Sequence, residues 1–137
     1  MRRIPKLSLP NLAIVALCAA TLGGCSKAQE EYRSYCAVFN VNRQFDTPTT
    51  SQAQMNVKNV GKECGINMAP DDAAAQNSSI DQQPLHGRAF IENAANGSYT
   101  HIGYIPAPGY TGKDAMVATV SSPFRRMTVT FSIDVYQ

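Results

Sequence analysis

The chain has 137 residues, of which 44% are hydrophobic and 16% are charged, and its formal net charge is +2. This length fits one domain of ordinary size and does not favour a second packed domain. So small a net charge excludes binding to nucleic acid by overall electrostatic attraction, and the hydrophobic content argues against a wholly disordered chain.

The first segment has the features of an export signal. Basic residues at positions 2, 3 and 6 precede an apolar run from Leu12 to Leu22, and the small residues Gly23 and Gly24 follow it. A basic start, an apolar stretch of about 7–15 residues and small residues before a cleavage site describe a signal peptide. The run is shorter than the roughly 20 apolar residues that a membrane-spanning helix needs, which argues against a retained transmembrane helix.

A cysteine follows these glycines directly. The motif Leu22-Gly23-Gly24-Cys25 resembles the lipobox of bacterial lipoproteins. The resemblance implies that residues 1–24 are removed, that the Cys25 thiol receives a diacylglyceryl group, and that the new amine is acylated. Two or three acyl chains anchor a protein stably, because each buried CH₂ contributes about 0.8 kcal/mol. The alternative is an ordinary signal peptide with an incidental cysteine.

The residue after this cysteine is Ser26 and not aspartate, which by resemblance to enterobacterial sorting implies the outer membrane. The mature chain would carry nine basic and ten acidic side chains, a net charge of −1. Anionic lipid would not attract it, so acyl chains on Cys25 are the expected contact with the membrane. We expect residues 25–34, which are polar and charged, to form a flexible tether to a single domain over 35–137.

Two cysteines, Cys36 and Cys64, remain once Cys18 leaves with the signal and Cys25 takes up lipid. Exported cysteine pairs are usually oxidised, so a Cys36–Cys64 disulfide is expected. It would close a loop of about 28 residues and stabilise the fold by roughly 3 kcal/mol. No metal site is expected, because neither histidine lies near a cysteine in sequence, and the Cys-x-x-Cys pair of a redox site is absent. No cofactor is expected.

The first half of the mature chain has two segments of strand character, at 35–41 and 55–58, separated by a loop rich in Thr, Pro and Ser at 46–54. Glycines on either side of Cys64 predict a turn there. The segment 69–84 has Ile80 as its only large apolar residue and cannot bury enough surface to offset its ordering entropy. It is therefore predicted to be a long mobile loop. Its acidic residues suggest calcium, but the spacing of an EF-hand loop is missing.

The second half predicts strands at 88–91, 98–105 and 115–121, with Asn96-Gly97 forming a type I′ turn between the first two. The clearest pattern lies at the C-terminus, where apolar residues at the odd positions from 127 to 135 alternate with polar ones. A period of two means one buried face and one solvated face. Short strands with Gly and Pro turns predict an all-β fold, a small antiparallel sandwich.

The order of motifs from Gly97-Ser98-Tyr99 through Tyr104-Ile105-Pro106 to the run 109–114 resembles bacterial Ig-like and cadherin-like modules, over about residues 86–137. The resemblance implies an Ig-like sandwich used in adhesion or binding. Glycines 109 and 112 permit a tight corner. Tyr110 is expected to fold back as an apolar plug, and Asp114 to accept backbone N–H bonds and hold the corner. The calcium-binding acidic strings of cadherins are absent, and the N-terminal half does not match these modules.

The sequence contains no nucleophile elbow, zinc-protease helix or phosphate-binding loop. His86 and His101 offer an acid–base pair with Asp114 or Glu92, but a histidine in a strand-like segment is usually polar surface. The sequence therefore favours a non-catalytic binding or adhesion module over a small periplasmic enzyme.

A contact patch is predicted from five residues: Tyr104, Tyr110, Phe124, Arg125 and Arg126. The alternative is that the two tyrosines pack internally and the arginines occupy a solvated turn. The expected partner is an envelope protein or a surface ligand, with no nucleic acid. A further alternative is an accessory lipoprotein subunit of a secretion, pilus or other envelope machine.

Overall fold

The computed structural model describes residues 27–42, 49–69 and 77–137. A helix covers 27–35. The strands that follow are β1 (Cys36–Phe39), β2 (Thr49–Lys58), β3 (Cys64–Met68), β4 (Ser79–Gln82), β5 (Gly87–Asn93), β6 (Thr100–Pro106), β7 (Gly112–Ser121) and β8 (Arg126–Tyr136). All of them lie in one compact unit, Ser34–Gln137. The signal segment 1–24 and Cys25 lie outside the described residues.

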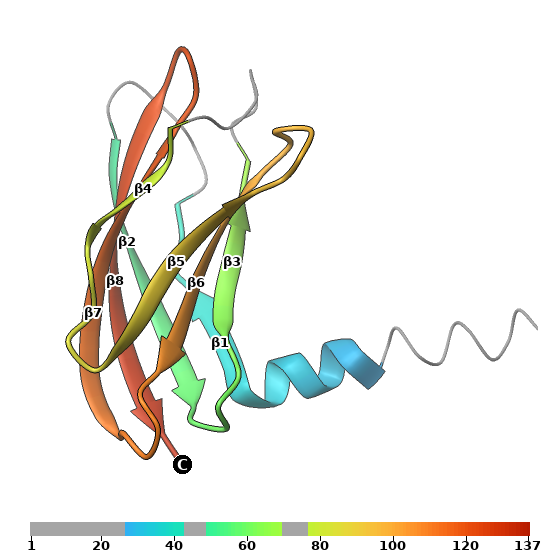
Figure 1. The fold of residues 1–137 in the computed structure, drawn as a ribbon, viewed down its shortest axis with the longest axis vertical. Coiled ribbons are helices and arrows are strands. Elements are labelled where there is room, and N and C mark those ends of the chain that lie inside the picture. The colour runs from blue at the N-terminus through green and yellow to red at the C-terminus, as the bar shows by residue number, and fades with distance from the viewer. Residues whose placement is uncertain (1–26, 43–48, 70–76) are drawn as a thin grey trace, which may run out of the picture. The chain divides into compact units, whose positions relative to one another are not determined.

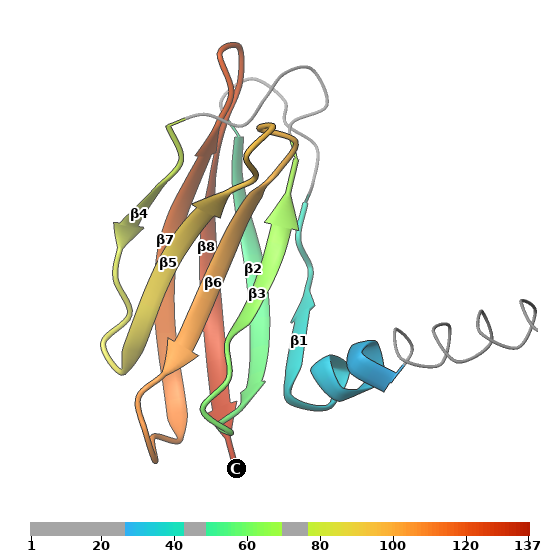
Figure 2. The same ribbon diagram turned by 45° about the vertical axis from the view of Figure 1, so that its right-hand side comes forward.

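The strands form two sheets that face each other as the layers of a sandwich (Figures 1 and 2). The five-stranded sheet has the order β1-β2-β8-β7-β4, and the three-stranded sheet has the order β3-β6-β5. The all-β prediction is confirmed. The prediction of purely antiparallel pairing is wrong for one pair, because β2 runs parallel to β8 over its whole length, from Thr49 to Lys58. The remaining pairs among the described strands are antiparallel.

Strand β8 is the centre of the larger sheet and carries much of the core. Its odd-numbered residues from Met127 to Val135 are all buried, whereas Thr130 and Ser132 on the other face are exposed. The predicted alternation is confirmed. Methionines from three other strands, Met55, Met68 and Met116, are also buried in the core. Flexible thioether side chains suit a core without tryptophan, because they fill irregular gaps.

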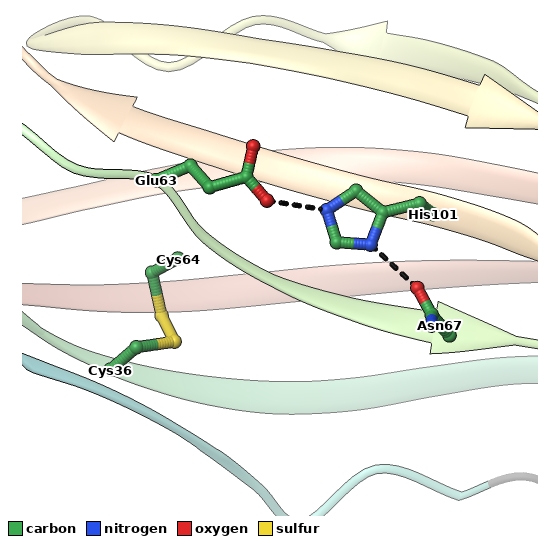
Figure 3. A network of polar contacts seen from close by, with 5 residues as sticks. All are labelled: Cys36, Glu63, Cys64, Asn67 and His101. Atoms are coloured by element: carbon green, nitrogen blue, oxygen red, sulfur yellow. Dashed lines mark hydrogen bonds and ion pairs between the residues drawn. A yellow bond between two sulfur atoms is a disulfide. The ribbon is translucent and has the colours of Figure 1, made fainter. Parts of the chain in front are cut away.

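The predicted disulfide is confirmed. Cys36 and Cys64 are bonded, with their Cα atoms 5.2 Å apart and 28 positions apart in sequence. The bond joins β1 of the larger sheet to β3 of the smaller one (Figure 3). It therefore ties the two layers together at one side of the sandwich.

Three predictions for the N-terminal half need correction. The helix over 27–35 occupies most of the segment expected to be a flexible tether, 25–34, where Lys, Ala, Gln, Glu and Arg favour helix. Strand β2 begins at Thr49, inside the loop predicted at 46–54. The turn predicted around Cys64 is instead the start of β3, and the positive φ of +73° lies at Gly61. In β2 the inward residues Ser51 and Ala53 are small, which hides the alternation from a hydrophobicity pattern.

The mobile loop predicted at 69–84 is wrong for residues 79–82, which form β4 and pair with β7. Residues 70–76 lie outside the described residues. The predicted hairpin between β5 and β6 exists, but its turn is not type I′. Gly97 has φ +70°, whereas Asn96 is not among the described residues with positive φ, and the loop is closed by Ala94 N–H donating to Tyr99 O at 2.9 Å.

Candidate functional site

The five residues predicted to form a contact patch do not lie together. Phe124, Arg125 and Arg126 lie at the β7–β8 hairpin, whereas Tyr110 lies in the β6–β7 loop at the other end of β7. Tyr104 is 0% exposed and belongs to the core. The predicted patch is therefore wrong as a single surface.

The β7–β8 hairpin nevertheless presents Phe124 on a fixed turn. The Ser122 hydroxyl accepts hydrogen bonds from the backbone N–H of Phe124 and of Arg125, and Ser122 N–H donates to Arg125 O at 2.8 Å. Phe124 is 77% exposed.

On strand β4, hydrogen bonds from the Thr119 and Ser79 hydroxyls, with the charge of Arg126, lower the pKa of Asp81.

Asp114 binds a neighbouring turn rather than its own corner. Its carboxylate accepts hydrogen bonds from the backbone N–H of Leu85, His86 and Ala115, each at 2.9 Å, and from the Tyr104 hydroxyl at 3.1 Å. Burial by itself would raise the pKa of Asp114. These hydrogen bonds outweigh burial and hold the pKa below its ordinary value. Burial and the adjacent carboxylate raise the pKa of Tyr104. Asp114 therefore accepts backbone bonds as predicted, and it fixes the turn before β5.

Tyr110 is not an apolar plug. Its ring stacks on the His86 ring, with centroids 4.2 Å apart and 10° between the planes, and its hydroxyl donates to Lys113 O at 2.6 Å. Positive φ angles of +75° at Gly109 and +132° at Gly112 form the predicted corner. The His86 ring thus stacks on an aromatic ring, and only its backbone N–H reaches Asp114.

His101 lies between two polar side chains of the β3 segment (Figure 3). Its Nε2 atom is 2.9 Å from Glu63 Oε1, and its Nδ1 atom is 2.6 Å from Asn67 Oδ1. The ring contacts Glu63 and Asn67, and not Asp114 or Glu92, the partners considered for an acid–base pair.

Glycines allow this imidazole and a neighbouring ring to lie across the outer face of the smaller sheet. A Cβ atom at Gly65 would be 2.8 Å from the Nε2 atom of His101, and one at Gly103 would be 2.3 Å from the Phe90 ring. The Arg88 guanidinium lies over the Phe90 ring, 5.3 Å from its centroid. This face is therefore covered by its own side chains.

The outer face of the larger sheet differs from this face, because it has an open cavity. A cavity of about 490 Å³ opens there between β2, β8 and β7. The cavity is lined by Gln54, Met55, Asn56, Lys113, Asp114, Ser132, Ile133 and Asp134. Met55, Asp114 and Ile133 are buried, and the five other residues, which are polar and are called the groove below, are Gln54, Asn56, Lys113, Ser132 and Asp134. These residues come from three strands that pair only in the folded chain, and sequence reasoning did not find them.

A second cavity, of about 280 Å³, lies beside Leu85 and the Lys113–Ala115 segment of β7. Within the described ranges, no three His, Cys, Asp or Glu side chains gather closely enough to hold a metal ion. Nor does any helix among those residues have the length and apolar character needed to cross a membrane.

Comparison with known proteins gives little. No protein-family profile matches the chain, and no curated protein sequence does. Among solved structures, the solution structure of Amebosin matches with a TM-score of 0.45 and 14% identity, over 66% of this chain and 100% of that one. A similarity this low carries no argument about function.

Proposed function

We propose that this protein is a lipid-anchored, non-catalytic binding module of the bacterial cell envelope. The lipobox-like motif Leu22-Gly23-Gly24-Cys25 supports the anchor, and Ser26 after it supports the outer membrane. Acyl chains on Cys25 hold the protein at the membrane, and the β-sandwich contacts an envelope protein or a surface ligand.

The observation that carries the binding role is the groove on the larger sheet. It is concave and carries five polar side chains, and it is built on paired strands rather than on a loop. Sites on rigid strands hold their side chains in a fixed geometry before a ligand arrives, which reduces the entropy cost of binding.

The side chains that an acid–base enzyme would use are already engaged in contacts within the fold, which supports a non-catalytic role. Asp114 is committed to a turn and to Tyr104, and His101 has Glu63 and Asn67 on its two nitrogens. A general base needs a free nitrogen or oxygen within reach of its substrate. These groups act in holding the fold.

The strand order supports an Ig-like class for the sandwich. In chain order, β3 to β8 correspond to strands B to G: β3-β6-β5 gives the B-E-D sheet, and β4-β7-β8 gives the C-F-G sheet. β2 takes the place of the first strand but pairs in parallel with the last. The disulfide departs from the antibody pattern, because it joins β1 to β3 and not B to F.

The test uses the full chain expressed in a bacterial host, as wild type and as Cys25→Ser. Wild type should fractionate with membranes and Cys25→Ser, once its signal is removed, should not. Detergent-solubilised wild-type protein should then retain an envelope protein or glycan on affinity purification. Membrane attachment of processed Cys25→Ser would refute the anchor. Recovery of wild type with no partner from intact envelopes would refute the binding role.

A further inference from the structure

We infer that the groove on the larger sheet binds a neutral oligosaccharide. This inference rests on the proposed binding function and names its ligand class.

Strand register brings the lining residues into two rows across the sheet. In one row Asn56 of β2, Asp134 of β8 and Lys113 of β7 are neighbours; in the next, Gln54, Ser132 and Ala115 are neighbours. Neighbours in a row share a face of the sheet. That face is outward, since Met55 and Ile133 between the rows are buried.

The hollow has a plain steric cause. Ser132 lines the floor of the cavity, and Ala115, its register neighbour on β7, also has a short side chain but does not line this cavity. Longer side chains surround them: the amides of Gln54 and Asn56 on one side and Lys113 on the other. A short floor between longer walls gives a depression that crosses the strands.

The groove offers both hydrogen-bond donors and acceptors. The Gln54 carbonyl oxygen accepts from Asn40 Nδ2 at 3.1 Å, which fixes the amide and leaves its NH₂ group to donate. The Asn56 amide and the Ser132 hydroxyl make no hydrogen bond with other residues that the structure describes. An amide and a hydroxyl each donate and accept, as sugar hydroxyls do.

The charges in the groove balance. Lys113 Nζ donates to Asp134 Oδ2, so one cation and one anion lie side by side at the rim. A site for phosphate or for an acidic polymer would need an excess of cations. Asp134 keeps its second carboxylate oxygen, and Lys113 keeps further ammonium protons, for hydrogen bonds to a ligand. The balanced pair therefore suits a neutral ligand rich in hydroxyl groups.

Two exposed aromatic residues lie on the same face, at two edges of the groove. Phe39 of β1 is opposite Gln54 in register and is 38% exposed; Tyr136 of β8 lies two residues beyond Asp134 and is 44% exposed. The negative face of an aromatic ring attracts the C–H groups of a sugar ring. From strand and residue spacings the Cα atoms of the two residues are about 16 Å apart, which is the scale of an oligosaccharide rather than a monosaccharide.

The experiment applies the purified full-length lipoprotein, in detergent, to an array of neutral and N-acetylated oligosaccharides, whose multivalent display compensates for weak single-site affinity. Wild type should bind a subset. Ser132→Arg fills the floor of the groove at an exposed position, and it should abolish binding. Phe39→Ala and Tyr136→Ala should each weaken it about tenfold, as loss of one principal contact does.

Phe124→Ala is the matched control, because it removes an exposed aromatic residue at the β7–β8 turn, away from the groove. It should leave binding unchanged. Absence of glycan binding by the wild type, or binding that Ser132→Arg leaves intact, would overturn the inference. Loss of glycan binding in Phe124→Ala alone would also overturn the inference.

Failure of the ligand assignment can be told apart from failure of the proposed function. If wild type and Ser132→Arg both retain the same envelope protein and neither binds glycans, the binding module stands and the oligosaccharide assignment falls. If neither retains any envelope component, both fall. An extended peptide captured by wild type but not by Ser132→Arg would place a ligand in the groove and overturn its assignment as a glycan.

Discussion

Replacing Asp114 by asparagine tests whether one carboxylate fixes the turn before β5 to strand β7. Oδ1 accepts hydrogen bonds from the backbone N–H of Leu85 and Ala115, and Oδ2 accepts from His86 N–H and from the Tyr104 hydroxyl. Asparagine keeps the shape of the side chain. It removes the charge and turns one acceptor into a donor.

The expected loss of stability follows from the hydrogen-bond partners of Asp114. With the amide nitrogen in place of Oδ2, the Tyr104 hydroxyl can rotate to accept, but the His86 N–H then faces a donor. An unsatisfied N–H costs about 1–3 kcal/mol, and the bonds that remain lose the charge that roughly doubles their strength, so Asp114→Asn should destabilise the fold by about 2–4 kcal/mol.

Urea denaturation of the disulfide-bonded protein at neutral pH measures this loss. The matched control is Asp134→Asn, the same chemical change on the adjacent strand. Asp134 forms an exposed ion pair with Lys113, and such pairs contribute about 0–1 kcal/mol. Equal losses for the two variants would refute the role given to Asp114.

The pH dependence supplies a second check. Hydrogen bonds from Leu85, His86 and Ala115 N–H outweigh burial and lower the pKa of Asp114 in the folded protein. A lowered folded pKa stabilises the fold at pH values above the unfolded pKa of about 3.9, and that contribution is lost as the pH falls through the folded pKa. The advantage of wild type over Asp114→Asn should therefore be complete at neutral pH and shrink in acid. A constant difference across that range would contradict the argument.

Three further predictions concern the anchor, the disulfide and the core. Intact mass of the mature protein should show a diacylglyceryl adduct on Cys25; an unmodified cysteine would contradict it. Reduction of Cys36–Cys64 should lower the free energy of unfolding by roughly 3 kcal/mol, measured by denaturation with and without reductant. Phe131→Ala should cost about 3–5 kcal/mol and Thr130→Ala at most about 0.5–1 kcal/mol; similar costs in denaturant melts would mean that β8 does not have one buried face.

The features that the sequence predicted correctly are those with a local pattern. The alternation from Met127 to Val135 predicted the buried face of β8, and the even number of cysteines left after the expected signal peptide and lipidation predicted the Cys36–Cys64 bond. Strand β4 was missed because its order comes from another strand. Ser79 and Ile80 pair with β7, and the Asp81 carboxylate accepts a hydrogen bond from the Thr119 hydroxyl. None of this is visible within the segment itself.

The predicted contact residues failed for a related reason. Tyr104 and Tyr110 are close in sequence, but the strand period places Tyr104 inward, where its hydroxyl reaches Asp114. Residues six apart share a face only while the strand continues, and β6 ends at Pro106. Proximity in sequence was therefore a poor guide to a shared surface, whereas pairing between β2 and β8 joined residues about 80 positions apart.

The two outer faces of the sandwich show why the groove is the better candidate for recognition. Both faces have small residues on adjacent strands. On the smaller sheet, Phe90 lies across Gly103 and His101 lies across Gly65, so rings from neighbouring strands fill the space above the glycines. On the larger sheet, a cavity remains above Ser132 instead. A face whose side chains already satisfy one another must break those contacts before it can bind. A face that keeps donors and acceptors around a hollow exchanges them only with water, and the cost of binding there is correspondingly lower.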